Sequence, residues 1–166
     1  MRGKVYIALV ILSFTILGLF LSEATTEPIP TGEKQQGVCW VGLPQAITDS
    51  QIVDVKEIGV SWISQTPFGW QRSSYDTSIN TESKLQTPWW GESRKGLAIT
   101  TALARKQGIK TLLKPHIWVK NSWPGAIEMK SDGEWKAWFN HYENFILPYA
   151  ALADSVGIEI FCIGTE

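Results

Sequence analysis

The chain is poor in charge and in the residues that bind metals. Only 19% of its 166 residues are charged, the formal net charge is -1, and it contains two cysteines and two histidines. Binding to nucleic acid through the phosphates requires a surplus of Lys and Arg, so this composition argues against that class. No group of His, Cys, Asp or Glu has the spacing of a metal site. We therefore expect no nucleic-acid partner, no catalytic metal and no cofactor.

The chain also lacks the glycine-rich loop of a dinucleotide-binding protein. Gly42-Leu43-Pro44 follows the first apolar run, where such a protein has G-x-G-x-x-G. Cysteine is scarce as well, and Cys39 and Cys162 each lie within an apolar run. This position predicts two small buried side chains rather than a disulfide, although an exported chain would permit one.

One long uncharged run stands at the N-terminus. Arg2 and Lys4 precede about 17 apolar or small residues from Val5 to Leu21, and a small-x-small cleavage site follows them. Residues 1–24 are therefore predicted to be a signal peptide. The alternative is an uncleaved anchor, because this run reaches the short limit for a membrane span. Either way, we expect an exported protein that is secreted, periplasmic or at the cell surface.

Residues 25–36 are polar, contain proline and are interpreted as a linker. After the linker, apolar runs alternate with amphipathic helical patterns. The predicted strands cover residues 37–42, 60–68, 109–119 and 158–166, and the predicted helices cover residues 48–59, 92–107 and 133–156. Gly59, Gly108 and Gly157 are expected to end the three helices. Apolar strands that alternate with helices predict a parallel sheet, so the fold class is α/β.

Two folds fit this order of elements, a (β/α)8 TIM barrel and a four-stranded doubly wound parallel sheet. A barrel needs about 250 residues, and residues 37–166 supply roughly half of that. The last predicted strand has no helix after it, which would expose an apolar face and an open strand edge. With the missing dinucleotide loop, these features favour a TIM barrel that is truncated after strand four. The doubly wound sheet stays the alternative.

The last predicted strand ends on a carboxylate, Glu166. Catalytic side chains of barrels lie at the carboxyl ends of the strands, so Glu166 is a candidate catalytic residue. His116, near the end of the third predicted strand, shares one side of that strand with Leu112 and Lys114. If the fourth strand points the same way, His116 lies beside Glu166 and is able to bond a sugar or a carboxylate. A buried structural histidine is the alternative.

Nine tryptophans are many for a chain of this length. Five of them fall in or beside the long segments after the second and third predicted strands: Trp70, Trp89, Trp90, Trp118 and Trp123. An indole combines a large apolar face with one N–H donor, which suits stacking on a sugar ring. We take Trp70, Trp118 and Trp123, together with Trp40 on the first strand, as candidate substrate-binding residues. Packing is the alternative for each.

Several segments together carry a family resemblance. They are GVCWVG, SQTPFGWQ, LLKPHIWV followed by SWPGAI, WKAWFNHYENFILPYAALA, and FCIGTE. They are similar to blocks of the clan A glycoside hydrolases and most similar to family 113, whose known members include endo-β-1,4-mannanases. Many clan A families have Asn before the acid/base residue, whereas this chain has Thr165, which fits family 113 better.

The resemblance implies a retaining glycosidase in which Glu166 is the general acid/base and a glutamate on strand seven is the nucleophile. Retaining hydrolysis needs two carboxyl groups about 5 Å apart. The sequence contains no seventh strand, so we expect this chain alone to be inactive. The expected substrate is a β-linked, mannan-like polysaccharide or oligosaccharide, and a membrane is expected as a partner only if the N-terminal segment stays as an anchor. The alternative function is an exported, non-catalytic glycan-binding protein, which would keep the tryptophans and lack the carboxyl pair.

Overall fold

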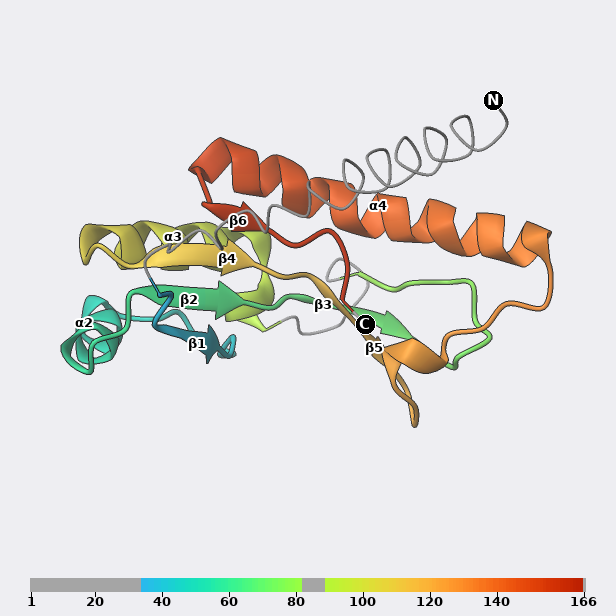
Figure 1. The fold of residues 1–166 in the computed structure, drawn as a ribbon, viewed down its shortest axis with the longest axis horizontal. Helices are drawn as coiled ribbons and strands as arrows, with labels where there is room; N and C mark the ends of the chain where they lie inside the picture. Colours follow the sequence, from blue (N-terminus) through green and yellow to red (C-terminus); the bar gives the residue numbers. More distant parts are fainter. Residues whose placement is uncertain (1–33, 82–88, 166) are drawn as a thin grey trace, which may run out of the picture. The chain divides into compact units, whose positions relative to one another are not determined.

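The structure, a computed structural model, describes residues 34–81 and 89–165 (Figure 1). The predicted signal peptide, most of the predicted linker and Glu166 lie outside the described residues. All the helices and strands described here belong to one compact unit, Gln35–Glu166. Within the two described ranges, no helix is both long enough and apolar enough to cross a membrane.

Two parallel sheets form the centre of this unit. The larger sheet contains, in spatial order, β1 (Gly37–Trp40), β2 (Trp62–Gln65), β4 (Lys110–Leu113) and β6 (Ile160–Phe161), and the smaller sheet contains β3 (Phe68–Gln71) and β5 (His116–Val119). The strands of the larger sheet follow one another in chain order, and each pair is parallel. β3 and β5 continue beyond the ends of β2 and β4 (Figure 1). The smaller sheet is therefore an extension at the carboxyl ends of the strands.

Two prolines separate the sheets. The predictions of one continuous second strand and one continuous third strand are wrong at Pro67 and Pro115, because proline has no N–H to donate to a ladder. The backbone N–H of Lys114 still donates to the oxygen of Gln65, and that of His116 donates to the oxygen of Pro67. The two backbones therefore stay hydrogen-bonded side by side where the prolines interrupt the strands.

Within the described part of the chain, three α-helices connect the strands. They are α2 (Asp49–Glu57), α3 (Arg94–Lys106) and α4 (Asp132–Val156), and the short 3-10 helices η2 (Trp90–Glu92) and η3 (Pro124–Ala126) precede α3 and α4. The side chains of Ser93 and Ser131 accept hydrogen bonds from the first turns of α3 and α4. Gly157 ends α4 with a φ of 67°, a conformation that favours glycine. The three predicted helices are confirmed to within a few residues at each end.

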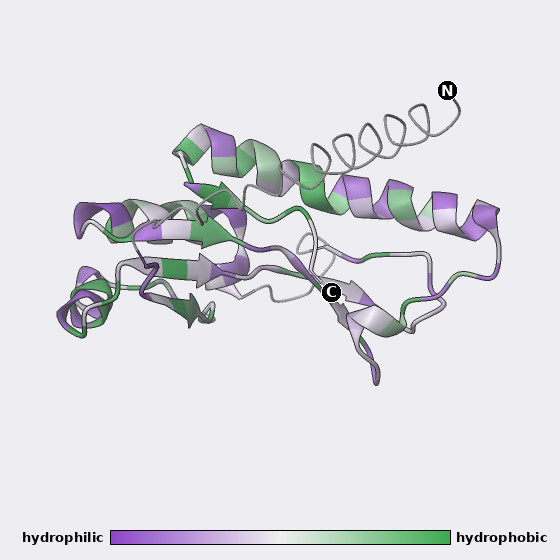
Figure 2. Ribbon diagram, viewed as in Figure 1, coloured by the Kyte–Doolittle hydropathy of each residue, from purple (hydrophilic) through white to green (hydrophobic). Residues whose placement is uncertain are grey.

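All three helices cover the same side of the larger sheet. Ile52 of α2 shares a buried cluster with Ile63 of β2, and Phe145 of α4 shares another with Leu113 of β4. Ile63 pairs with Thr111, two residues before Leu113, so these strand residues point the same way. Figure 2 shows the hydrophobic and hydrophilic residues interleaved along α4, as amphipathic packing requires. A doubly wound sheet has helices on both sides, so that alternative is wrong and the fold is that of a TIM barrel.

The other side of the larger sheet carries no helix among the described residues. It corresponds to the barrel interior, and a shallow cavity of about 240 Å³ lies there against Gly37, Cys39 and Ser64. Cys39 is exposed and Cys162 is half-buried, and neither forms a disulfide. The prediction of two buried thiols is therefore wrong, because both side chains lie on this open side rather than under the helices.

Candidate active site

The extension at the carboxyl ends of the strands carries four aromatic rings on one side. Phe68 pairs with His116, and Trp70 pairs with Trp118 across the parallel strands. The ring centroids of Phe68 and His116 are 5.6 Å apart, and those of Trp70 and Trp118 are 5.8 Å apart. Trp118 is 52% exposed. We call these four residues the aromatic platform, and they include three of the candidate residues predicted from the sequence.

The opposite side of the same extension is buried under the helices. Gly69, Gln71, Ile117 and Val119 alternate with the platform residues and are all buried. A Cβ on Gly69 would lie 2.8 Å from the side chain of Ile79 and 3.0 Å from that of Phe145. Only glycine fits this contact, so the back of the extension is fixed against α4. This packing sets the direction in which the aromatic platform points.

One hydrogen bond joins the platform to the end of the chain. The Nδ1 of His116 lies 2.5 Å from the Oγ1 of Thr165. The hydroxyl of Tyr142 donates to the backbone oxygen of Ile163 over 2.9 Å and holds the same segment against α4. Among the described residues, Thr165 therefore lies beside His116, and Thr165 directly precedes Glu166 in the sequence. The role of Glu166 itself stays a prediction, because that residue lies outside the described part of the chain.

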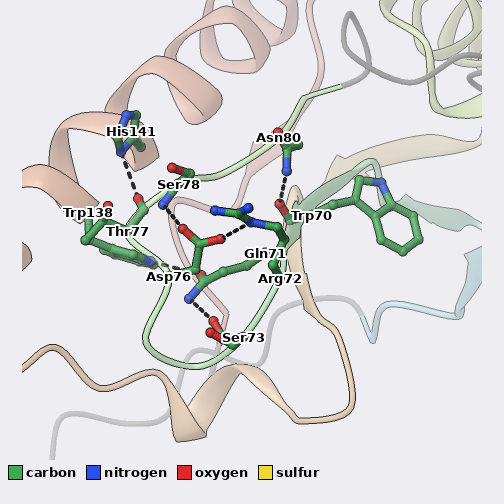
Figure 3. A network of polar contacts seen from close by, with 10 residues as sticks. All are labelled: Trp70, Gln71, Arg72, Ser73, Asp76, Thr77, Ser78, Asn80, Trp138 and His141. Carbon is green, nitrogen blue, oxygen red and sulfur yellow. Dashed lines mark hydrogen bonds and ion pairs between the residues drawn. The ribbon is translucent and has the colours of Figure 1, made fainter.

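A polar network holds the segment that follows β3 (Figure 3). The Nε1 of Trp138 donates to the Oε1 of Gln71 over 3.0 Å, and the Nε2 of Gln71 donates to the backbone oxygen of Ser73 over 2.8 Å. Backbone hydrogen bonds in both directions join Trp70 to Asn80. Figure 3 shows the indole of Trp70 pointing away from these contacts. The network therefore supports the backbone of β3, and the residues drawn in Figure 3 make no polar contact with the indole of Trp70.

Two further contacts fix the same segment. Arg72 Nε and Asp76 Oδ2 form an ion pair at 2.6 Å. Burial, the largest single influence, acts to raise the pKa of Asp76, but the hydrogen bonds from Arg72 and Ser78 and the charge of Arg72 together lower it below its usual value. His141 Nδ1–H donates to the backbone oxygen of Thr77 over 2.8 Å. His141 therefore links α4 to this segment.

Two predicted substrate-binding tryptophans lie apart from the aromatic platform. Trp40 pairs with Gln65, whose side chain donates to Thr101 of α3, so Trp40 lies on the side of the sheet that the helices cover. It packs there against a buried cluster, and packing accounts for its position. Trp123 is 60% exposed, and its indole lies over Gly125 at the start of η3. The substrate-binding roles of these two residues stay predictions.

Sequence reasoning missed one carboxyl group at this end of the sheet. Glu92 ends η2, and its carboxylate faces the backbone N–H of Phe68. Burial raises the pKa of Glu92, and this N–H partly offsets that effect. The prediction had placed Glu92 at the start of the second helix, but Ser93 is the cap of that helix. A capping serine directly after the glutamate was the signal that places it in the loop at the strand ends.

Within the described ranges, no three side chains of His, Cys, Asp or Glu gather as a metal site would require. The chemistry available at the strand ends is therefore aromatic stacking, hydrogen bonding by His116, and carboxyl groups. The fold and these residues define a TIM-barrel protein with an aromatic surface at the carboxyl ends of its strands.

Comparison with known proteins identifies the family. The sequence model of Glycoside Hydrolase Family 113 matches residues 43–166, so the chain belongs to this family, as its motifs predicted. The fold is similar to a GH113 β-mannanase of Alicyclobacillus acidocaldarius in complex with ManMIm, with a TM-score of 0.66 and 24% identity over 79% of this chain and 44% of that one. It is also similar to a GH113 β-1,4-mannanase, with a TM-score of 0.65 and 20% identity over 81% of this chain and 46% of that one. The chain thus spans less than half the length of these structures, and no curated protein matches it.

Proposed function

We propose that this chain supplies the general acid/base and part of the glycan-binding surface of a retaining glycoside hydrolase that acts on mannan-like, β-linked polysaccharide. The observation that carries the proposal is the aromatic platform, which lies at the carboxyl ends of the strands and is hydrogen-bonded through His116 to Thr165. Membership of Family 113 supports the reaction class. The solved structures named as β-mannanases support the choice of a mannan-like substrate.

The platform has the chemistry to bind a sugar. The C–H faces of a pyranose ring are apolar and stack on an indole, and the hydroxyl groups at the ring edge need polar partners. The half-exposed Trp118 offers such a face, and its neighbour Trp70 extends it. His116 supplies a polar ring in the same row. We propose that one sugar unit stacks on Trp118 with its edge toward His116.

In this proposal Glu166 protonates the oxygen of the leaving sugar. A retaining enzyme uses one protonated carboxyl group for this step and an ionised carboxylate about 5 Å away for attack on the anomeric carbon. Glu166 follows Thr165 directly, and Thr165 is held at the platform by His116. The family resemblance assigns the nucleophile to strand seven. We therefore expect the 166-residue chain to bind β-linked oligosaccharides without cleaving them.

The test measures binding and cleavage separately. The purified chain is titrated by calorimetry with β-1,4-mannohexaose, with α-linked maltohexaose as the control, and the products are analysed after long incubation. We expect binding of the β-linked oligosaccharide alone and no products. The absence of binding would contradict the proposed glycan site. Turnover that is lost in Glu166→Gln would show that the chain holds its own nucleophile. It would contradict the proposal that this chain supplies the acid/base and that the nucleophile lies on a strand outside it.

A non-catalytic glycan-binding protein is the second candidate, because the exposed Trp118 face suits binding whether or not cleavage follows. The two candidates differ in the protein that contains the remaining strands. An enzyme has a second glutamate at a strand end, and a binding protein lacks it.

We also propose that the protein is exported and that residues 1–24 are removed. The charged, apolar and small-residue regions of the N-terminal sequence support this proposal. N-terminal sequencing of the exported protein tests it. A mature chain that begins near Thr25 is expected, whereas an intact N-terminus on a membrane-bound protein would support the anchor.

A further inference from the structure

We propose that Glu92 is a glycan-binding carboxylate, which accepts hydrogen bonds from hydroxyl groups of the sugar unit held by the aromatic platform. This inference rests on the proposed function and adds a binding residue to it. The carboxylate lies at the carboxyl ends of β1 and β2, whereas the bond between His116 and Thr165 joins the start of β5 to the segment that follows β6. The Phe68–His116 pair of the platform lies between these two polar positions.

Tight backbone contacts hold η2 at the end of β1. The N–H of Gly91 donates to the oxygen of Leu43 over 2.8 Å, and the N–H of Trp90 donates to the oxygen of Pro44 over 3.3 Å. A Cβ on Gly91 would lie 2.6 Å from the nitrogen of Leu43 and 2.7 Å from the Cα of Gly42. No real Cβ makes such contacts, so two glycines are required where the backbones meet. The segment that carries Glu92 is therefore fixed to the loop after β1.

The side chain of Glu92 extends from this junction toward the platform. Its Cγ would lie 2.8 Å from a Cβ on Gly42, so the side chain passes directly over that glycine. Its carboxylate then faces the backbone N–H of Phe68, whose ring lies 5.6 Å from the ring of His116. A carboxylate has two oxygens with about four acceptor positions, and one N–H occupies only one of them. The remaining positions lie next to a platform residue.

Contact with the Phe68 N–H alone does not require a charged group at this position. Glu92 is half-buried, and within residues 34–81 and 89–165 it forms no ion pair. Burial raises the pKa of Glu92, which means that the surroundings disfavour its ionised form. A glutamine would accept the Phe68 N–H without that cost. A carboxylate does offer stronger hydrogen bonds to hydroxyl donors, which is the advantage expected at a sugar site.

The experiment compares Glu92→Gln with a matched variant, Glu159→Gln, in the 166-residue chain. Glu159 also accepts a backbone N–H, that of Thr111 over 2.8 Å, but it lies before β6 at the opposite end of the sheet. Calorimetric titration with β-1,4-mannohexaose gives the affinity, and thermal unfolding at neutral pH gives the stability. We expect Glu92→Gln to weaken binding about tenfold or more, with an unchanged or higher melting temperature. Glu159→Gln is expected to bind like the wild type.

Each other outcome has a defined meaning. If the wild type binds and Glu92→Gln binds equally well, the inference is overturned and the proposed function stands. If binding and melting temperature both fall in Glu92→Gln, Glu92 is a structural brace for Phe68 and the inference is overturned as well. If the wild type binds no β-linked oligosaccharide, the proposed function fails and this inference fails with it.

Discussion

The indole Nε1 of Trp138 donates a hydrogen bond to the Oε1 of Gln71 over 3.0 Å, and only 8% and 2% of these side chains are exposed. Trp138 belongs to α4, and Gln71 ends the strand that carries Phe68 and Trp70. The bond thus connects the helix layer to the back of the aromatic platform. Because both partners are buried, neither atom can exchange this bond for one to water.

Replacing Trp138 by Phe should therefore lower the free energy of unfolding. The change leaves the Oε1 of Gln71 buried without its donor, and an unsatisfied buried acceptor costs about 1–3 kcal/mol. Urea denaturation measures the loss. The matched control is Trp123→Phe, which alters a 60% exposed side chain and should change stability by less than about 0.5 kcal/mol. Equal effects of the two changes would contradict the role given to the Gln71 contact.

Two glycine-to-alanine changes should act in opposite directions. In Gly91→Ala the new Cβ meets the backbone of Leu43 at 2.6 Å, so η2 must shift and stability should fall. In Gly133→Ala the nearest atom is 3.9 Å away, and alanine in the first turn of α4 should stabilise the protein by up to about 1 kcal/mol. Thermal unfolding of both variants tests the prediction. A Gly91→Ala protein as stable as the wild type would refute the close junction between the two loops.

Removal of the Trp118 ring should weaken glycan binding without unfolding the protein. Trp118 is 52% exposed, so Trp118→Ala loses little packing but removes the proposed stacking face. We expect the affinity for β-1,4-mannohexaose to fall about tenfold, which corresponds to roughly 1.4 kcal/mol. Phe139→Ala removes a similarly exposed ring, 58%, from α4 and should leave the affinity unchanged. If Trp118→Ala binds the oligosaccharide like the wild type, the aromatic platform is not part of the glycan-binding site.

The stability of the protein should depend on pH through Glu92. Burial raises the pKa of this carboxyl in the folded state, against the opposing effect of the Phe68 N–H. The folded protein therefore keeps the proton at pH values where the unfolded chain has lost it. The stability that Glu92 contributes is complete below the usual glutamate pKa of about 4.3 and is lost as the pH rises through the higher folded value.

Comparison with Glu92→Gln isolates this effect. Asp76 has a lowered pKa and shifts stability in the opposite direction, but it is present in both proteins and cancels. Melting temperatures are measured between about pH 4 and pH 8. The melting temperature of Glu92→Gln should increase relative to that of the wild type as the pH rises. A difference that stays constant over this range, or that shrinks toward neutral pH, would mean that burial does not raise the pKa of Glu92.

Most of the fold was predictable because local signals mark it. Capping residues and glycines, such as Gly157 with its positive φ, set the ends of the helices, and the apolar strands gave the parallel order. The splits at Pro67 and Pro115 were missed because each proline lies inside a continuous apolar run. The exposure of Cys39 was missed for another reason. Side chains along a strand point alternately to the two faces of the sheet, but this alternation does not show which face the helices cover.

The site was predictable where it follows strand geometry. The alternation along the third strand placed His116 on the same side as Leu112 and Lys114, and the structure brings it to Thr165. Trp40 shows the limit of composition, because a tryptophan suits sugar stacking and core packing equally well. The role of Gln71 depends on its contact with Trp138, which is distant in sequence, so no local pattern indicates it. For Glu92 the capping Ser93 was a local signal of its place in the loop, but its proximity to Phe68 was not visible in the sequence.

The central claim is that Glu166 is the general acid/base, and leaving-group dependence tests it most directly. The measurement uses Glu166→Ala in the enzyme that joins this chain to the strand bearing the nucleophile. Hydrolysis of mannohexaose, whose leaving sugar needs a proton, should fall far more than hydrolysis of an activated aryl β-mannoside, which needs none. Added azide should restore the aryl mannoside reaction by attacking the glycosyl-enzyme in place of activated water. An equal loss on both substrates, without rescue by azide, would contradict this role of Glu166.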